Sequence, residues 1–264
     1  MGLLAGVVCT TSARADERRF TYVYEPETLP QGAFEFENWV TWRAGRTGVV
    51  GQDNYNRWDL RQEIEYGVTD RYTAAFYVNE SSTSYSDPFS GANQSEFSFE
   101  GVSLENRYMV LNPAEHKIGL TLYLEGTYSG KEAEIETKII LGQRHGPWKW
   151  AVNFNYANEW EDKLSKVEGE AGASLGIARD LGKHWALGLE LRNVNLFPNY
   201  QEWENSALYL GPTLSYRHEK FWAALSVLPQ IYGWNNSASQ DGNSQRELND
   251  NEKINVRLLF GINF

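Results

Sequence analysis

The sequence predicts an all-β fold, a transmembrane antiparallel up-and-down β-barrel of about 12 strands. Three observations predict it. Apolar and polar residues alternate along most of the chain, which is typical of strands that have one apolar face. Most alternating runs hold about 9–13 residues, near the roughly 9–11 that a tilted strand needs to cross a bilayer. Short turns also alternate with longer polar connections, as they do in transmembrane barrels.

The chain's overall polarity does not contradict this prediction. The mean hydropathy is −0.54, and no run of about 18 apolar residues exists that could form a spanning helix. In a barrel strand the two faces cancel in any average, so a low mean hydropathy is compatible with a membrane location. A secreted soluble β-sandwich or lipocalin-like barrel is the competing fold, and strand length is one feature that disfavours it.

The N-terminal region predicts export. Leu3 to Val8 form a short apolar core, and Ala13-Arg14-Ala15 fits a small-residue cleavage site. We therefore expect residues 1–15 to be a signal peptide that is cleaved after Ala15. Residues 16–32 are expected to be a periplasmic lead-in, with a short segment inside the lumen as the alternative. The barrel is expected over residues 33–264.

The alternating runs place the strands and the turns. Strands are expected at about 33–42, 55–66, 72–80, 97–110, 118–128, 134–143, 148–160, 167–179, 185–193, 207–217, 221–231 and 252–264. An even number brings both termini to one side. The connections of one set are short, at 67–71, 111–117, 144–147, 180–184 and 218–220. The other set contains the long connections 43–54, 81–96, 194–206 and 232–251, and also the short 129–133 and 161–166.

The last strand carries a resemblance to a known class. Counted back from the terminus, every second residue is apolar, beginning with Phe264, Ile262, Phe260 and Leu258. This pattern resembles the outer-membrane β-barrels of Gram-negative bacteria, as does the turn phrase from Tyr66 to Arg71. The resemblance is to barrels of this class generally, most closely to uncharacterised ones and small substrate channels.

The resemblance implies where the protein resides and what it meets there. It implies that the barrel-assembly machinery reads the terminal strand as an assembly signal. It also implies an outer-membrane location, with membrane lipid and lipopolysaccharide as surroundings, and it leaves the oligomeric state open. The count of twelve requires the last strand to pair with residues 33–42, and we expect Val256 near Phe36.

Aromatic residues are expected in two belts at the membrane interfaces. One group lies beside the short turns: Tyr66, Tyr72, Tyr108, Trp148, Trp185, Tyr216, Phe221, Trp222 and Phe264. A second group lies nearer the long loops: Trp42, Trp58, Trp160 and Trp234. The alternative is that these aromatics are simply good strand residues.

The polar face of the strands predicts a charged lumen. The acids expected to line it are Glu35, Glu37, Asp59, Glu63, Glu65, Glu105, Glu125, Glu134, Glu136, Glu168, Glu170 and Glu190. The bases are Arg57, Arg61, Arg107, Lys138, Lys149, Arg192, Arg217 and Arg257. Twelve acids against eight bases leave a net charge of −4. Such a wall needs either water or ion pairing, so the lumen is a narrow channel with a weak preference for cations or is closed by salt bridges.

Composition excludes several function classes. The formal net charge of −11 disfavours nucleic acid as a partner. The only cysteine, Cys9, lies in the predicted signal peptide, so disulfides and thiol chemistry are not expected. The four histidines fall in four different short turns (His116, His145, His184 and His218), so neither a metal site nor a histidine-dependent hydrolase is expected.

Carboxylates raise two further alternatives. The pairs Glu35/Glu37, Glu63/Glu65, Glu134/Glu136 and Glu168/Glu170 have a spacing that could serve glycoside hydrolysis. Four such pairs around one lumen indicate a generally charged wall instead. Connection 232–251 and the residue after it could hold a surface Ca²⁺ through Asp241, Asn243, Asn249, Asp250 and Glu252, although a solvated polar loop is favoured. We therefore predict no enzymatic activity, no cofactor and no metal.

The leading functional prediction is an outer-membrane channel for passive passage of small polar or cationic solutes. The alternative is a closed structural or binding barrel that acts through its surface loops. An outer-membrane lipid-modifying enzyme is a third hypothesis, which the positions of the histidines disfavour.

Overall fold

The computed structural model describes residues 18–46, 52–87, 89–161, 166–236 and 245–264. The predicted signal peptide 1–15 lies outside the described residues, as do Asp241 and Asn243. Within the described part, no helix is both long and apolar enough to cross a membrane.

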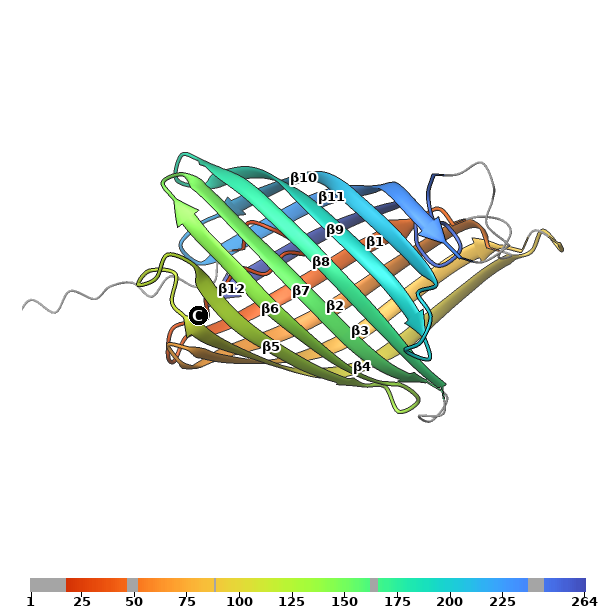
Figure 1. The fold of residues 1–264 in the computed structure, drawn as a ribbon, viewed down its shortest axis with the longest axis horizontal. Helices are drawn as coiled ribbons and strands as arrows, with labels where there is room; N and C mark the ends of the chain where they lie inside the picture. Colours follow the sequence, from red (N-terminus) through yellow and green to blue (C-terminus); the bar gives the residue numbers. More distant parts are fainter. Residues whose placement is uncertain (1–17, 47–51, 88, 162–165, 237–244) are drawn as a thin grey trace, which may run out of the picture.

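Twelve antiparallel strands form one closed barrel in which each strand pairs with its neighbours in sequence and β1 pairs with β12 (Figure 1). The predicted fold class and strand number are therefore confirmed. The strands are β1 (Phe34–Ala44), β2 (Asp53–Thr69), β3 (Tyr72–Ser86), β4 (Asn93–Leu111), β5 (Gly119–Tyr128), β6 (Ala133–His145), β7 (Trp148–Glu161), β8 (Lys166–Leu181), β9 (Trp185–Pro198), β10 (Asn205–Arg217), β11 (Phe221–Asn235) and β12 (Ile254–Asn263).

The two ends of the barrel differ in their connections. We call the end that carries the turns after β2, β4, β6, β8 and β10 the short-turn rim, and the opposite end the long-loop rim. The expected long loop 81–96 is wrong, because β3 and β4 continue as a paired hairpin and leave only residues 87–92 as a connection. This extension is rich in serine and polar residues, so it lacks the apolar alternation that marks a spanning strand. Backbone hydrogen bonding does not require that alternation.

The apolar faces of the strands point outward. Trp58, Leu104 and Phe154 are each about half exposed, although such side chains normally lie in a protein core. An apolar exterior around a charged interior is the arrangement of a transmembrane barrel. Trp222 corrects the predicted aromatic belt, because its side chain is fully buried and its indole N–H donates to Glu35 in the lumen. Two aromatics stand side by side at Phe221 and Trp222, so one of them must face inward.

The seam between β1 and β12 closes the barrel. Phe36 lies opposite Ile262, and Val256 lies opposite Trp42. The expected proximity of Val256 and Phe36 is therefore wrong. In an antiparallel pair the first residues of β12 meet the last residues of β1. The N–H of Phe264 donates to the carbonyl of Phe34 at 3.0 Å, which extends the pairing to the C-terminal residue.

Candidate functional site

The lumen contains a segment of the chain itself. Residues 18–30, which we call the plug, precede β1 and lie inside the barrel (red in Figure 1). Phe20, Thr21, Val23 and Leu29 have no solvent exposure. Of the two alternatives for residues 16–32, the described residues 18–30 adopt the lumen segment rather than an external lead-in.

Side chains of the wall satisfy the backbone of the plug, because the plug has no strand partner. The carboxylate of Glu190 on β9 accepts hydrogen bonds from the backbone N–H groups of Thr21 at 2.7 Å, Tyr22 at 2.8 Å and Val23 at 3.3 Å. Asn153 on β7 accepts from the N–H of Tyr24 at 2.6 Å and donates to its carbonyl at 2.9 Å. These contacts hold residues 21–24 against β7 and β9.

Glycines on the inner face of the wall make room for the plug. A Cβ atom at Gly67 would lie 2.0 Å from the carbonyl oxygen of Pro30, and one at Gly176 would lie 2.7 Å from the ring of Phe20. Neither distance is compatible with a side chain, so the plug approaches the wall as closely as the backbone allows. The glycines therefore fit the barrel to this segment.

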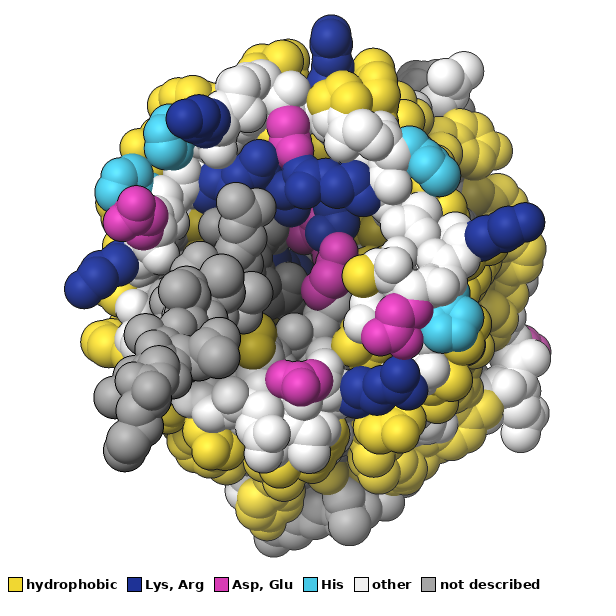
Figure 2. Space-filling view, turned by 90° about the vertical axis from the view of Figure 1, so that its left-hand side faces the viewer, with side chains coloured by type: hydrophobic (Ala, Val, Ile, Leu, Met, Phe, Trp, Pro, Cys, Tyr) yellow, Lys and Arg dark blue, Asp and Glu magenta, His cyan; other side chains and the backbone are white. Residues whose placement is uncertain are grey.

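Charged groups fix the plug near the short-turn rim. Arg19 donates to Asp180 at 3.1 Å, and Asp180 also pairs with Arg217 at 2.9 Å. Glu25 lies 3.0 Å from Lys149. Burial by itself raises the pKa of Glu25, but attraction to Lys149 and Arg19 outweighs it and holds the pKa below its ordinary value. Figure 2 views the barrel from this end, where Lys and Arg side chains gather in a central hollow and histidines lie around the rim.

The predicted lumen residues fall into two groups and one outlier. The first group is buried in the wall beside the plug: Glu35, Glu37, Glu63, Glu65, Glu105, Arg107, Glu125, Lys149 and Glu190. The second group lines a cavity between the plug and the long-loop rim: Arg57, Asp59, Arg61, Glu134, Glu136, Lys138, Glu168, Glu170, Arg192 and Arg257. Arg217 lies apart from both, with Asp180 near the short-turn rim.

The cavity has a volume of about 390 Å³ and a strongly charged wall. Tyr22 and Tyr24 of the plug form its floor. Nine acids and six bases line it, which leaves three net negative charges. The acids are Asp59, Glu80, Glu100, Glu132, Glu134, Glu136, Glu159, Glu168 and Glu170, and the bases are Arg43, Arg57, Arg61, Lys138, Arg192 and Arg257.

The charges of the cavity are segregated. Five of the acids lie on β6, β7 and β8, whereas five of the six bases lie on β1, β2, β9 and β12. Several bases are already paired: Arg43 and Arg57 each contact Asp59 at 2.6 Å, and Arg61 lies 3.3 Å from Glu125. Among the described residues, two of the five acids on the acidic wall have an ion-pair partner: Glu136 pairs with Lys138, and Glu170 lies 4.0 Å from Arg192. A solute in the cavity would meet an acidic wall facing a largely neutralised one.

Sequence reasoning missed some residues of the cavity. Arg43 continues the inward alternation of β1, so a longer strand would have included it. Glu100 could not be found in this way. The β3–β4 register shifts between Asn79 and Glu80, opposite Gly101, whose φ of 111° suits glycine. This shift brings Glu100 to the inside of the barrel, where its carboxylate lies 3.3 Å from Arg57.

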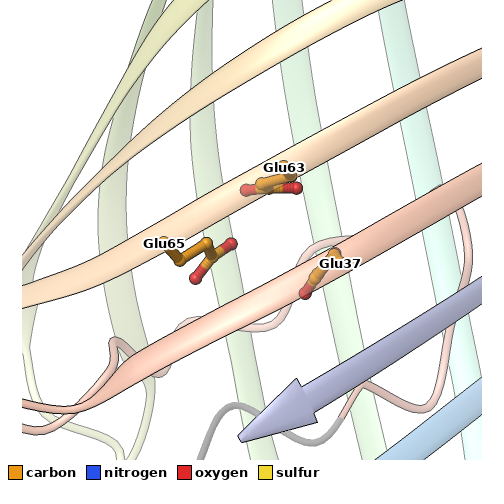
Figure 3. A group of neighbouring side chains, drawn as sticks. All are labelled: Glu37, Glu63 and Glu65. Atoms are coloured by element: carbon orange, nitrogen blue, oxygen red, sulfur yellow. The ribbon is translucent and has the colours of Figure 1, made fainter. Parts of the chain in front are cut away.

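Three carboxylates meet in the buried layer below the cavity. Glu37 on β1 and Glu63 and Glu65 on β2 point toward one another inside the barrel (Figure 3). One oxygen of each lies within 4.8 Å of the others. Among the described residues this is the one group of three side chains with the spacing of metal ligands, and it contains no histidine.

Two of the histidines, and two carboxylates of the alternative loop site, contact other side chains of the protein. The rings of His184 and His218 stack on each other at 5.7 Å. In the loop before β12, Asp250 accepts from Asn205 at 2.9 Å and Glu252 pairs with Arg46 at 2.8 Å. These carboxylates are thus engaged by side chains of the protein.

Comparisons with known proteins agree with the fold. A family model described as "Family of unknown function (DUF6662)" matches residues 12–139 and 147–264. No curated protein sequence matches the chain. Among solved structures, the chain is similar to the COG4313 outer membrane channel from Pseudomonas putida F1, with a TM-score of 0.65 and 14% identity over 93% of this chain and 100% of that one.

Two further structures are similar. The β domain of the Bordetella autotransporter BrkA has a TM-score of 0.57 and 10% identity over 89% of this chain and 100% of that one. The NanC porin has a TM-score of 0.54 and 8% identity over 86% and 98%. At these identities the likeness concerns the barrel fold alone.

Proposed function

This chain belongs to the DUF6662 family, and from that premise and its barrel we propose that it is an outer-membrane channel for passive passage of small polar or cationic solutes. The observation that carries the proposal is the charged cavity of about 390 Å³ above the plug. A cavity wall with fifteen charged side chains needs water, counter-ions or ion pairing, and a cavity of this volume has room for water. A hydrated, charged passage across an apolar shell is what a solute channel requires.

The balance of charge supports a preference for cations. The cavity wall carries three net negative charges, and the acids on β6–β8 have fewer ion-pair partners than the bases opposite them. Cations would therefore concentrate in the cavity relative to anions. The plug narrows the route at the floor, so we expect small solutes and low conductance.

Planar-bilayer recordings of the purified protein test this function. With a KCl gradient across the bilayer, the reversal potential of the wild type should indicate selectivity for K⁺ over Cl⁻. Replacing Glu134, Glu136 and Glu170 together by Gln should move the reversal potential toward zero. Glu115→Gln serves as the control, because Glu115 does not line the cavity, and its reversal potential should match that of the wild type.

The presence of the plug favours one second candidate. A barrel with residues 18–30 bound in its lumen could be closed and act as a binding or structural protein through its loops. Protein that inserts into bilayers yet passes no current, with no swelling of dextran-loaded proteoliposomes in iso-osmotic solutions of small solutes, would support this candidate and refute the channel.

A further inference from the structure

We propose that Glu37, Glu63 and Glu65 form a binding site for a hard divalent cation of the size of Ca²⁺. Glu37 and Glu63 are opposite each other in the β1–β2 register, and Glu65 follows two residues later on the same face. Figure 3 shows the three carboxylates converging inside the barrel. Their exposed fractions are 1%, 0% and 2%, so the site is closed to bulk solvent.

The carboxylate of Glu63 gives a second reason, besides the spacing of the three carboxylates, to expect a bound cation. Both oxygens of its carboxylate are buried, and neither has a hydrogen-bond partner among the residues that the structure describes. A buried carboxylate without a donor is among the most costly groups in a protein interior. A cation bound between Glu63 and its two neighbours would supply the missing charge and the missing ligand.

The two neighbouring carboxylates are oriented by other groups. The indole N–H of Trp39 donates to Oε2 of Glu37 at 2.7 Å, and a guanidinium nitrogen of Arg18 lies 3.8 Å from the same oxygen. Arg107 pairs with Oε2 of Glu65. Each of these carboxylates is thereby held by one of its oxygens, in the manner of metal ligands that are fixed by a surrounding layer of donors.

The local charge balance leaves room for a dication. Arg107 also pairs with Glu105 at 2.8 Å, so this carboxylate belongs to the same buried group. Among the described residues, four carboxylates (Glu37, Glu63, Glu65 and Glu105) face two guanidinium groups (Arg18 and Arg107), and four negative charges against two positive ones leave −2. Glu35, buried opposite Glu65, adds a further carboxylate beside this group. One divalent cation would offset most of this negative charge.

The closed surroundings of the three carboxylates favour Ca²⁺ over Mg²⁺. Carboxylate oxygens are hard ligands, which suit both ions, and three oxygens within 4.8 Å of one another can contact either ion. Mg²⁺ demands near-octahedral geometry and usually keeps several of its waters, whereas Ca²⁺ accepts carboxylates in a flexible geometry. Side chains that are at most 2% exposed leave little access for retained water, so we expect the site to bind Ca²⁺ more tightly.

This site is separate from the proposed channel. None of the three carboxylates lines the charged cavity. A bound cation would join β1 to β2 behind the plug, where it would act on stability. The inference therefore does not rest on the channel function, and a barrel that conducts no ions could still bind Ca²⁺.

Refolding in the presence and absence of metal gives the test. The full mature chain is unfolded in urea with a chelator and refolded into detergent, so that no buried ion survives, and is then titrated with CaCl₂ or MgCl₂. We expect one Ca²⁺ per chain by calorimetry and by elemental analysis, and a higher thermal unfolding temperature with Ca²⁺. We expect Mg²⁺ to bind at least tenfold more weakly.

Conservative variants locate the ion. Glu63→Gln and, separately, Glu37→Gln should lower Ca²⁺ affinity at least tenfold, whereas Glu134→Gln, a carboxylate of the cavity wall, should bind as the wild type does. Circular dichroism and the gel shift of the unheated barrel verify that each variant is folded. No Ca²⁺ binding by the wild type, or equal binding by folded Glu63→Gln, would overturn the proposal. Stabilisation of Glu63→Gln without any metal binding by the wild type would instead mean that the carboxylates share protons.

Discussion

The anchoring of the plug by Glu190 gives a quantitative prediction. The carboxylate of Glu190 accepts from the backbone of Thr21 through one oxygen and from Tyr22 and Val23 through the other. In Glu190→Gln one oxygen becomes an amide group, which cannot accept. The best arrangement keeps the amide oxygen at Tyr22 and Val23 and leaves the N–H of Thr21 without its acceptor.

The magnitude follows from these contacts. A hydrogen bond to a charged group contributes about 1.5–3 kcal/mol, and one between neutral groups about 0.5–1.5 kcal/mol. Loss of the Thr21 bond and weakening of the other two therefore cost the docked plug about 3 kcal/mol or more. Since about 1.4 kcal/mol is a factor of ten, the ratio of displaced to docked plug should rise about a hundredfold.

Hydrogen–deuterium exchange with mass spectrometry measures this ratio. Peptides that cover residues 18–30 should exchange about a hundredfold faster in Glu190→Gln than in the wild type, because amide exchange from the displaced state follows its population. Peptides from β3 and β4 should be unaffected, and Glu134→Gln should match the wild type throughout. Plug exchange that stays within about threefold of the wild type would refute the assigned role of Glu190.

Two further predictions concern the seam and the close approach of plug and wall. Cysteines in place of Trp42 and Val256 should form a disulfide in the membrane, because directly opposed residues have Cα atoms about 4.5–5.5 Å apart. The disulfide would be seen as a shift on a non-reducing gel. Cysteines in place of Phe36 and Val256 should not form one, and the reverse result would show that the register is different. Gly176→Val should displace Phe20 and speed hydrogen–deuterium exchange in the plug, since overpacking costs about 1–3 kcal/mol. Exchange in the plug at the wild-type rate would mean that the ring of Phe20 can move aside.

Alternation made most of the barrel predictable. A strand with one apolar face repeats every two residues, so charged residues such as Glu63 and Arg107 can be assigned to the lumen once the strand is recognised. The even strand count and the closing pair of strands follow from the same pattern. What alternation predicts is a face: nine of the predicted lumen residues are buried beside the plug, ten line the cavity, and Arg217 lies with Asp180.

Features that break the two-residue period were not predictable in this way. Beyond the register shift opposite Gly101, the residues of β4 that face inward change from odd to even numbers, so the alternation does not identify Glu100 as a lumen residue. Adjacent aromatics at Phe221 and Trp222 fit either face, so Trp222 was assigned to the wrong side. The plug has no periodic pattern, and its position depends on partners such as Asn153 that lie more than a hundred residues away in sequence.

The contacts of the plug with β12 bear on the order in which the molecule is assembled. The guanidinium carbon of Arg257 lies 3.7 Å from the ring centre of Tyr22, and a nitrogen of the same side chain donates to the carbonyl of Thr21 at 3.5 Å. The segment synthesised before the first strand thus contacts the strand synthesised last. A nascent chain cannot complete these contacts until β12 has emerged, so the plug reaches its full set of contacts only when the strand that closes the barrel is present.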